Sequence, residues 1–335
     1  MHARALLASM LIGALTFGCG ADANAPSAPV SASATPDASR DGASAPGPGG
    51  APDAGADASA PACEGAAAGG TAKRSLDVGG RERSFVVHAP AAAPTAPRPL
   101  VVAHHGFTET AEKMQEITHL DEVADARGFV VAYLQGLGNS WNAGACCGTS
   151  AATKVDDVAF VEAAVAAIAK DHCVDPRRVH AVGFSNGGFL AHRLGCEASG
   201  TFAAIGVVAG QIGVPVDECK PTRPVAVVQA HGTSDPVVPL RGNPVLSFRP
   251  TQETIDAWVA KNGCDPTAAA PVAKGDASCA RWSKCSGGAD VELCTVDGGG
   301  HDWFGGGSAW GKSGPPAGFV ATLHLVDFLL AHRRP

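Results

Sequence analysis

The middle of the chain predicts a strand, a sharp turn and a helix in direct succession. Residues 179–182 form a short apolar run, and residues 183–187 (Gly-Phe-Ser-Asn-Gly) follow at once with the spacing G-x-S-x-G. Apolar side chains then recur at helical intervals from Phe189 to Leu194. A serine at such a turn has a strained backbone, and the glycines on either side let the strand and the helix approach closely. The pattern therefore predicts that Ser185 Oγ lies at the tip of a strand-to-helix turn.

The G-x-S-x-G spacing also arises by chance in a chain with 42 glycines, so the surrounding pattern has to support it. Strands alternate with helices from residue 83 onward, and parallel strands need such helical crossovers. This alternation predicts a single α/β domain whose twisted, mostly parallel sheet has helices on both faces and reactive loops at the carboxyl ends of its strands. We expect strands at 83–89, 100–103, 129–134, 179–182, 203–208, 225–231 and 291–296, helices at 112–126, 156–170, 251–261 and 318–333, and a disulfide-braced loop region at 264–285.

Two later loops supply the partners that a nucleophilic serine needs. A serine hydroxyl is a poor nucleophile near neutral pH, so it requires a base, and the base requires an acid that fixes its tautomer. Asp235 follows the strand at 225–231, and His301 follows the strand at 291–296 among three glycines. The chain order Ser, Asp, His is that of α/β-hydrolases. We therefore expect Ser185, Asp235 and His301 to form a catalytic triad.

An oxyanion hole is expected from two backbone N–H groups. One belongs to Asn186, directly after the serine, and the other to Phe107, in the turn after the strand at 100–103. His104 and His105 are then expected to shape that turn, although metal ligation or a second base are the alternatives for this pair. Asp156 and Asp157 precede a helix and are interpreted as its N-terminal cap.

Six motifs, in the same order, resemble the polyhydroxybutyrate depolymerase and feruloyl esterase family of secreted α/β-hydrolases. The resemblance implies Ser185 as nucleophile, Asp235 as acid and His301 as base. It also implies that Trp141 and Trp303 line the substrate cleft, where the alternative is burial in the core. The motifs are His105-Gly106, Ser140-Trp141-Asn142-Ala143-Gly144 with Cys146-Cys147-Gly148, Val155-Asp156-Asp157-Val158, Gly183 to Gly188, His231-Gly232-Thr233-Ser234-Asp235, and Gly298-Gly299-Gly300-His301 with Trp303.

The chain departs from the family pattern at two positions beside the expected site. Phe107 stands where the family often has cysteine, and Asp302 stands where it often has threonine. Both departures affect the expected choice of substrate more than the expected catalysis. The bulk of Phe107 narrows the acyl side of the cleft, and Asp302 adds a negative charge near the expected base.

We therefore expect a serine carboxylic-ester hydrolase that works through an acyl-enzyme, without metal or organic cofactor, and is a monomer. Its substrates are expected to be feruloyl or acetyl esters of plant polysaccharide, or hydroxybutyrate-type polyesters and their oligomers. A serine peptidase uses the same residues and is one alternative. A surface lipoprotein that keeps the fold only for binding is another, although it would predict a damaged triad. The net charge of −7 argues against nucleic acid as a partner.

The first 62 residues predict export. Residues 5–17 form an apolar run of the length of a signal-peptide core, too short to span a bilayer. The segment 1–19 is therefore interpreted as a signal peptide, ending at Cys19 in a lipobox-like pattern that implies lipidation and a membrane anchor. Ordinary cleavage after Ala23 is the alternative. Residues 20–62 are rich in Ala, Pro, Ser, Gly and Asp and predict a disordered tether to the catalytic domain at 63–335.

The cysteine content agrees with an oxidising compartment. Ten cysteines remain after Cys19, an even number, and none of them has the C-x2-C spacing typical of zinc sites. We expect these ten to form disulfides, whose pairing the sequence alone does not determine.

Overall fold

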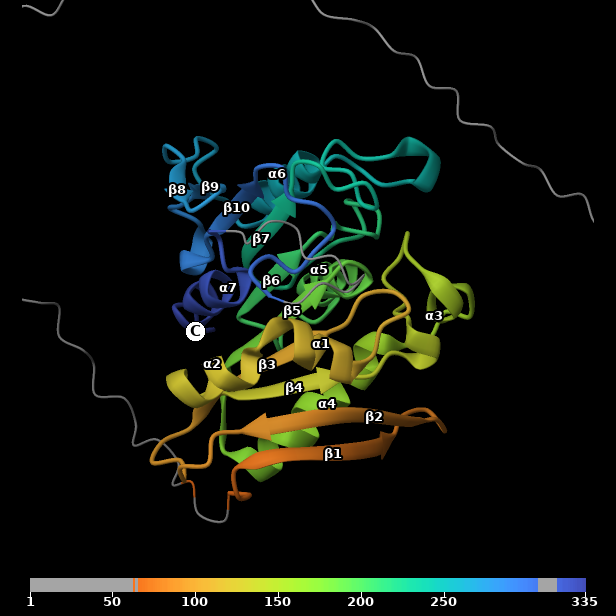
Figure 1. Cartoon of the computed structure of the whole chain (residues 1–335), viewed down its shortest axis with the longest axis vertical. Helices are drawn as coiled ribbons and strands as arrows, with labels where there is room; N and C mark the ends of the chain where they lie inside the picture. Colours follow the sequence, from red (N-terminus) through yellow and green to blue (C-terminus); the bar gives the residue numbers. More distant parts are fainter. Residues whose placement is uncertain (1–62, 64–65, 307–317) are drawn as a thin grey trace, which may run out of the picture. The chain divides into compact units, whose positions relative to one another are not determined.

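The computed structural model describes residues 63, 66–306 and 318–335, so the expected signal peptide, the lipidation site at Cys19 and the tether lie outside the described residues. A ten-stranded sheet runs through the described part in the order β1-β2-β4-β3-β5-β6-β7-β10-β9-β8, from bottom to top in Figure 1. The strands are β1 (Gly70–Asp77), β2 (Glu82–Ala89), β3 (Arg98–His104), β4 (Val130–Leu134), β5 (Val174–Phe184), β6 (Ala204–Val208), β7 (Ala226–Gly232), β8 (Val272–Lys274), β9 (Ala277–Trp282) and β10 (Val291–Val296).

The centre of the sheet is parallel and its two edges are antiparallel. Strands β4, β3, β5, β6, β7 and β10 pair in parallel. The β1–β2 pair joins one edge through β4, and the β8–β9 pair joins the other through β10, both in antiparallel register. All residues of β4, β6 and β7 are buried, as in strands covered on both faces. This arrangement confirms the expected α/β-hydrolase fold.

Helices cover both faces of the sheet and enclose two separate cores. Residues of α1, α2 and α7 pack with one face of the sheet, and residues of α4, α5 and α6 pack with the other. The helices are α1 (Ala111–Thr118), α2 (Leu120–Arg127), α3 (Gly148–Ala152), α4 (Asp157–His172), α5 (Asn186–Glu197), α6 (Thr251–Lys261) and α7 (Ala321–Leu330), with short 3-10 turns at Leu137–Asn139, Pro244–Leu246 and Ser286–Gly288.

The expected helix at 112–126 is wrong in one respect, because it is two helices. His119 lies between them with φ 52°, and its backbone N–H donates to Gln115 O, which ends α1. Left-handed backbone at a single residue closes a helix in the way that glycine usually does. A continuous helical pattern of apolar residues does not reveal this interruption.

The segment 264–285 is braced by a disulfide as expected, but the expectation of a loop is wrong, because the segment contains β8 and β9. Register partners Cys279 on β9 and Cys294 on β10 form a disulfide, and a second disulfide joins Cys264 to Cys285. The three residues of β8 are exposed, so this strand lacks the buried alternation that identifies strands in a sequence.

All ten cysteines expected to be oxidised form disulfides, which confirms that prediction. Beyond the two pairs named above, the pairs are Cys63–Cys173, Cys146–Cys147 and Cys196–Cys219. The Cys63–Cys173 bridge ties the start of the described chain to the residue before β5. The Cys146–Cys147 bridge joins neighbours in the loop between β4 and α4.

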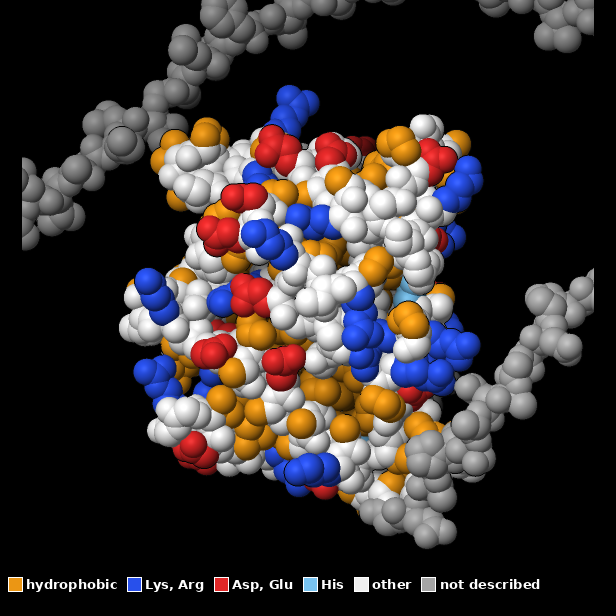
Figure 2. Space-filling model, turned by 180° about the vertical axis from the view of Figure 1, so that it is seen from behind, with side chains coloured by type: hydrophobic (Ala, Val, Ile, Leu, Met, Phe, Trp, Pro, Cys, Tyr) orange, Lys and Arg blue, Asp and Glu red, His pale blue; other side chains and the backbone are white. Residues whose placement is uncertain are grey.

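The surface carries charges of both signs. Figure 2 shows acidic and basic side chains on the same face, separated by small hydrophobic areas, with the densest group of Lys and Arg at its right edge. Within the described ranges, none of the helices has both the length and the apolar character needed to cross a membrane.

Candidate active site

Ser185 lies at the turn between β5 and α5 with φ 51° and ψ −120°, the strained conformation expected there. The flanking glycines are required by close backbone contacts. A Cβ at Gly183 would lie 2.0 Å from Gly187 O, and one at Gly187 would lie 2.1 Å from His104 O. Any side chain at either position would push the helix, the strand or the neighbouring turn out of place. The sequence prediction of a strand-turn-helix at this point is confirmed.

Ser185, His301 and Asp235 lie together at the carboxyl ends of three parallel strands. Ser185 Oγ is 2.9 Å from His301 Nε2, and His301 Nδ1 is 2.8 Å from Asp235 Oδ2. The Asp235 carboxylate also accepts the N–H groups of Val237 and Val238 at 2.8 and 2.9 Å through Oδ1. With its Nδ1–H donated to this carboxylate, the imidazole presents an unprotonated Nε2 to the serine hydroxyl. The arrangement is therefore able to remove a proton from Ser185.

Close packing of two turns brings the acid and the base together. A Cβ at Gly232, after β7, would lie 2.1 Å from Gly299 O, after β10. The N–H of Ser234 donates to the same carbonyl at 2.9 Å. Because β7 and β10 are neighbours in the sheet, their following turns are held in register next to each other. The glycines before His301 therefore allow the backbones of the two turns to pack against each other.

In the turn after β3, the N–H groups on either side of Phe107 have acceptors, whereas that of Phe107 has none among the described residues. Gly106 N–H donates to Glu109 Oε2 at 2.8 Å, Thr108 N–H to Asn139 O at 2.8 Å, and Glu109 N–H to Gly106 O at 3.2 Å. Phe107 N–H has no acceptor among the described residues. The N–H of Asn186, the first residue of α5, is in the same situation within the described part of the chain. Two free backbone donors therefore exist at the positions expected for an oxyanion hole.

Glu109 is a residue of this turn that the sequence analysis missed. Burial raises the pKa of its carboxyl group, while the hydrogen bond from Gly106 and the proximity of His301 oppose that rise. The carboxylate is bonded to a backbone N–H only three residues away. A short Gly-x-x-Glu spacing after a strand was the only available signal, and on its own it is weak.

His104 and His105 support the turn after β3. His105 accepts the N–H of Gly136 at Nε2 (2.9 Å) and donates Nδ1–H to Gly106 O (2.7 Å). His104 donates Nδ1–H to Val182 O at 2.8 Å. Burial lowers the pKa of each histidine to about 4, so both are neutral near pH 7. These contacts agree with a role in shaping the turn rather than with metal ligation.

Trp141 and Trp303, which were expected to line the cleft, are both buried, with 0% and 2% of their surface exposed, which agrees with the alternative of burial in the core. The indole N–H of Trp141 donates to His105 O at 2.9 Å, and that of Trp303 donates to Thr322 Oγ1 at 2.8 Å. An indole whose N–H has a protein acceptor can lie in the core at little cost. Phe107, which carries one of the two free N–H groups, is by contrast 42% exposed.

One cluster of potential metal ligands lies in the described ranges, well away from Ser185 in the sequence. Cys279, Glu292, Cys294 and His324 bring one ligand atom each within 4.8 Å of the others. The two sulfurs are joined in a disulfide, however, so they offer no thiolate to a metal. The contacts of the cluster are the ion pairs that Glu292 makes with His324 and Arg281.

Comparison with known proteins finds a matching esterase family model and relatives named as esterases. The family model for Esterase PHB depolymerase matches residues 83–252. The putative esterase NocK of Nocardia uniformis subsp. tsuyamanensis is 35% identical over 257 residues, which cover 70% of this chain and 75% of NocK. Feruloyl esterase B of Piromyces equi is 31% identical, with 61% of this chain and 39% of that protein covered. Feruloyl esterase C of Emericella nidulans is 34% identical, with 45% and 52% covered, so the chain spans about half or less of these two relatives.

Solved structures show the same fold at low sequence identity. An acetyl xylan esterase from Aspergillus awamori superposes with a TM-score of 0.53 and 16% identity, covering 69% of this chain and 94% of that one. A CE1 ferulic acid esterase from Anaeromyces mucronatus superposes with a TM-score of 0.52 and 14% identity, covering 80% and 92%. The family match and the 35% identity to NocK go further than the shared fold. The chain belongs to the Esterase PHB depolymerase family and is a carboxylic ester hydrolase.

Proposed function

We propose that this esterase works through an acyl-enzyme on Ser185, with His301 as base, Asp235 as its acid partner, and the N–H groups of Phe107 and Asn186 as the oxyanion hole. The observation that carries the proposal is the continuous pair of hydrogen bonds from Ser185 Oγ to His301 and from His301 to Asp235, at 2.9 and 2.8 Å. These distances lie within the range over which a base removes a proton directly.

In the first half of the reaction, Ser185 Oγ attacks the ester carbonyl while His301 Nε2 takes the hydroxyl proton. The carbonyl oxygen becomes negatively charged and accepts the two free N–H groups. Collapse of this intermediate breaks the bond to the alcohol, and His301 returns its proton to the departing oxygen. In the second half, His301 takes a proton from water, and the water oxygen bonds to the acyl carbon. The bond from that carbon to Ser185 Oγ then breaks, His301 returns the proton to Ser185 Oγ, and the acid leaves. Asp235 stabilises the protonated imidazole in both halves.

We propose soluble or oligomeric esters as substrates, with feruloyl and acetyl esters of polysaccharide ahead of hydroxybutyrate oligomers. The names of relatives and structural neighbours support this class, since they include feruloyl, ferulic acid and acetyl xylan esterases. Phe107 supports an aromatic or short acyl group, because its exposed ring lies on the residue that offers an oxyanion N–H. A serine peptidase remains the alternative within the same chemistry.

We also propose that the enzyme is exported. Five disulfides in the described chain are typical of oxidising compartments outside the cytosol. Together with the apolar run at 5–17, they favour a secreted enzyme, anchored through Cys19 if that cysteine is lipidated. Mass spectrometry of the mature N-terminus distinguishes lipidation at Cys19 from cleavage after Ala23.

Hydrolysis assays with a serine variant test the catalytic proposal. The full chain, Ser185→Ala and Ser278→Ala are assayed on p-nitrophenyl acetate, p-nitrophenyl butyrate, methyl ferulate, hydroxybutyrate oligomers and peptide p-nitroanilides. Ser278 is exposed on β9, so its alanine variant is a matched control that keeps full activity. Ser185→Ala is expected to lose about a millionfold in turnover. Equal activity of Ser185→Ala and the unchanged chain would exclude Ser185 as the nucleophile, and cleavage of peptides in preference to esters would favour the peptidase.

A further inference from the structure

We infer that Asp157 is a positioning residue for the oxyanion hole, acting through Asn142 and Trp141 on the two backbone groups that offer the free N–H donors. This inference rests on the proposed function, because it assigns a cause to the orientation of those donors. Asp157 itself was expected to cap a helix, and that expectation is wrong. Asp156 is the cap, since its Oδ1 accepts Ala159 N–H at 3.0 Å, whereas Asp157 is buried and its carboxylate accepts from Arg83 and from Asn142 N–H.

Trp141 connects the two halves of the proposed oxyanion hole. Its backbone N–H donates to Asn186 Oδ1 at 2.7 Å, and its carbonyl accepts Asn186 Nδ2–H at 3.1 Å. Its indole N–H donates to His105 O at 2.9 Å, in the turn after β3. Trp141 therefore holds both the side chain of Asn186 and the peptide group between His105 and Gly106.

The direction of Phe107 N–H is set by hydrogen bonds to two successive peptide groups, the one between His105 and Gly106 and the one between Gly106 and Phe107. The peptide between His105 and Gly106 is held at its carbonyl by Trp141 and at its N–H by Glu109 Oε2. The next peptide, which carries Phe107 N–H, is held at its carbonyl by His105 Nδ1–H at 2.7 Å. In a planar trans peptide the N–H points opposite to the carbonyl oxygen. Phe107 N–H is thereby turned away from these partners, and it has no acceptor among the described residues.

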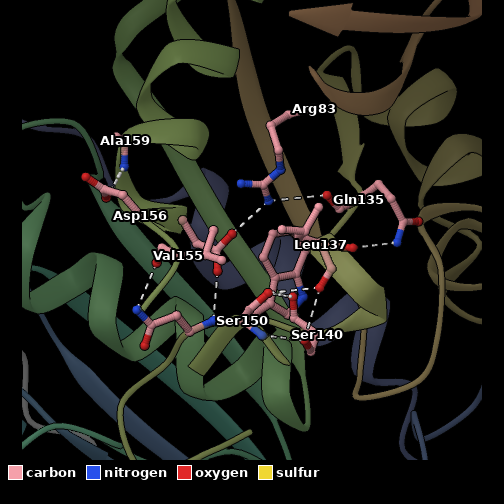
Figure 3. A network of polar contacts seen from close by, with 12 residues as sticks. Arg83, Gln135, Leu137, Ser140, Ser150, Val155, Asp156 and Ala159 are labelled. Carbon is pink, nitrogen blue, oxygen red and sulfur yellow. Dashed lines mark hydrogen bonds and ion pairs between the residues drawn. The ribbon is translucent and has the colours of Figure 1, made fainter. Parts of the chain in front are cut away.

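Asp157 holds Trp141 in place from the far side. Its Oδ2 accepts the backbone N–H of Asn142 at 2.7 Å, and its Oδ1 accepts the guanidinium of Arg83 at 2.7 Å. Figure 3 shows this guanidinium also reaching the backbone carbonyl of Gln135. The two charged side chains are 3% and 0% exposed, so water does not compete for these bonds. The neighbouring Phe160 ring stacks on both the indole of Trp141 and the guanidinium of Arg83.

Each oxygen of the Asp157 carboxylate accepts from a different donor, Oδ1 from Arg83 and Oδ2 from Asn142 N–H. The effect of replacing Asp157 by asparagine follows from this arrangement. An amide offers only one acceptor oxygen, so Asp157→Asn must turn its NH₂ group toward either Asn142 N–H or Arg83. The oxygen is expected to stay with the guanidinium, because a buried charge without an acceptor costs more than a buried N–H without one. The NH₂ group then faces Asn142 N–H, which loses its acceptor, and segment 141–142 is released from one anchor. The two oxyanion donors then lose alignment, while the Ser185–His301–Asp235 hydrogen bonds do not involve the changed group.

The test compares the full chain with Asp157→Asn and with Glu292→Gln as the matched control. Glu292 is also a buried carboxylate paired with an arginine, but it lies near the start of β10 and contacts Arg281 and His324 instead of the proposed site. Removing a whole oxyanion donor costs about 100-fold to 1000-fold in turnover, so misalignment is expected to cost about 10-fold to 100-fold. For Asp157→Asn we expect that loss in kcat on p-nitrophenyl acetate, a KM within about twofold, and a pH profile of unchanged shape.

A reversible trifluoromethyl ketone, which forms a tetrahedral oxyanion on a serine, is expected to lose affinity for Asp157→Asn by the same factor as kcat/KM. Glu292→Gln is expected to melt at a lower temperature with unchanged kcat. Unchanged kcat in Asp157→Asn, or an equal loss of kcat in Glu292→Gln, overturns the inference. If Asp157→Asn does not fold, Trp141→Phe decides, because it removes the indole bond to His105 while keeping an aromatic ring and the backbone bonds to Asn186. A lower kcat at constant KM supports the inference, and unchanged kcat overturns it. Retained activity in Ser185→Ala would instead overturn the proposed function, which is a different outcome from those that overturn this inference.

Discussion

Lowering the pH from 7 to 4 should destabilise the folded chain, and one buried histidine should supply a measurable part of the loss. His192 on α5 has no exposed surface. Its Nδ1 accepts the indole N–H of Trp258 at 3.0 Å, and its Nε2 lies 3.1 Å from Gln229 Oε1. Because an indole only donates, the neutral ring with its proton on Nε2 satisfies both contacts. A proton added at Nδ1 would face the indole N–H.

The size and sign of the effect follow from the pKa of this ring. Burial lowers the pKa of His192 from 6.5 to about 3. Its folded-state pKa therefore lies below that of the unfolded chain, so the unfolded chain binds the proton first as the pH falls. The full stability is present above pH 6.5 and decreases through the window down to the folded-state pKa. At about 1.4 kcal/mol per pH unit, the loss between pH 6.5 and pH 4 is about 3 kcal/mol.

Urea unfolding at pH 7, 6, 5 and 4, with the disulfides intact, measures this loss in the full chain and in His192→Gln. Buried His104, His105 and His180 titrate in a similar window, but they contribute equally to both proteins and cancel in the comparison. The unchanged chain should lose about 3 kcal/mol more than the variant, and His119→Gln, at a largely exposed histidine, should behave like the unchanged chain. Equal losses in the unchanged chain and in His192→Gln would refute the reasoning.

Three further substitutions test the site and its frame. Gly187→Ala puts a Cβ 2.1 Å from a backbone carbonyl of the neighbouring turn, so we expect little activity on p-nitrophenyl acetate and a lower melting temperature; an active variant with an unchanged melting temperature would contradict the close contact. Asp235→Asn keeps the shape of the acid but no longer fixes the tautomer of His301, so kcat should fall by about 10⁴-fold while the circular dichroism spectrum stays the same; a loss below about tenfold would speak against its role. Replacing Cys63 and Cys173 together by serine opens a bridge between residues 110 apart, and urea unfolding should show a loss of about 4 to 5 kcal/mol in the chain-entropy model; a loss under about 1 kcal/mol would mean that the unfolded chain is already constrained.

Much of the fold was predictable because local patterns and tertiary demands agree. Helix α6 and strand β10 have the bounds that apolar periodicity predicted, and the strand-turn-helix at Ser185 follows from its two glycines. The edge strands were missed for a physical reason. All of β1 except one partly buried residue is exposed, so its strand conformation depends on pairing with β2 rather than on a buried face. A partner strand is not visible in a local window of sequence.

Some residues of the candidate site could likewise be predicted from the sequence, and others could not. Asp235 and His301 were predictable because each follows a recognisable strand in the expected order. The direction of the Trp141 side chain was not, since glycines nearby are compatible with an indole that faces either a cleft or the core. Asp157 acts on residues far away in the sequence, with Arg83 separated from it by 74 positions and Asn142 by 15. No spacing rule connects such residues, and only the folded chain brings them together.

In the turn after β3, the direction of the Phe107 N–H and the exposure of the Phe107 ring depend on different contacts. Its backbone N–H is set by Trp141, Glu109 and His105, none of which bonds to the Phe107 side chain. Its ring is 42% exposed and free of that framework. The side chain at this position can therefore change the acyl side of the site while the donor for the oxyanion keeps its place. This separation lets one scaffold carry side chains of different size here and, under the proposed mechanism, direct the same chemistry to different esters.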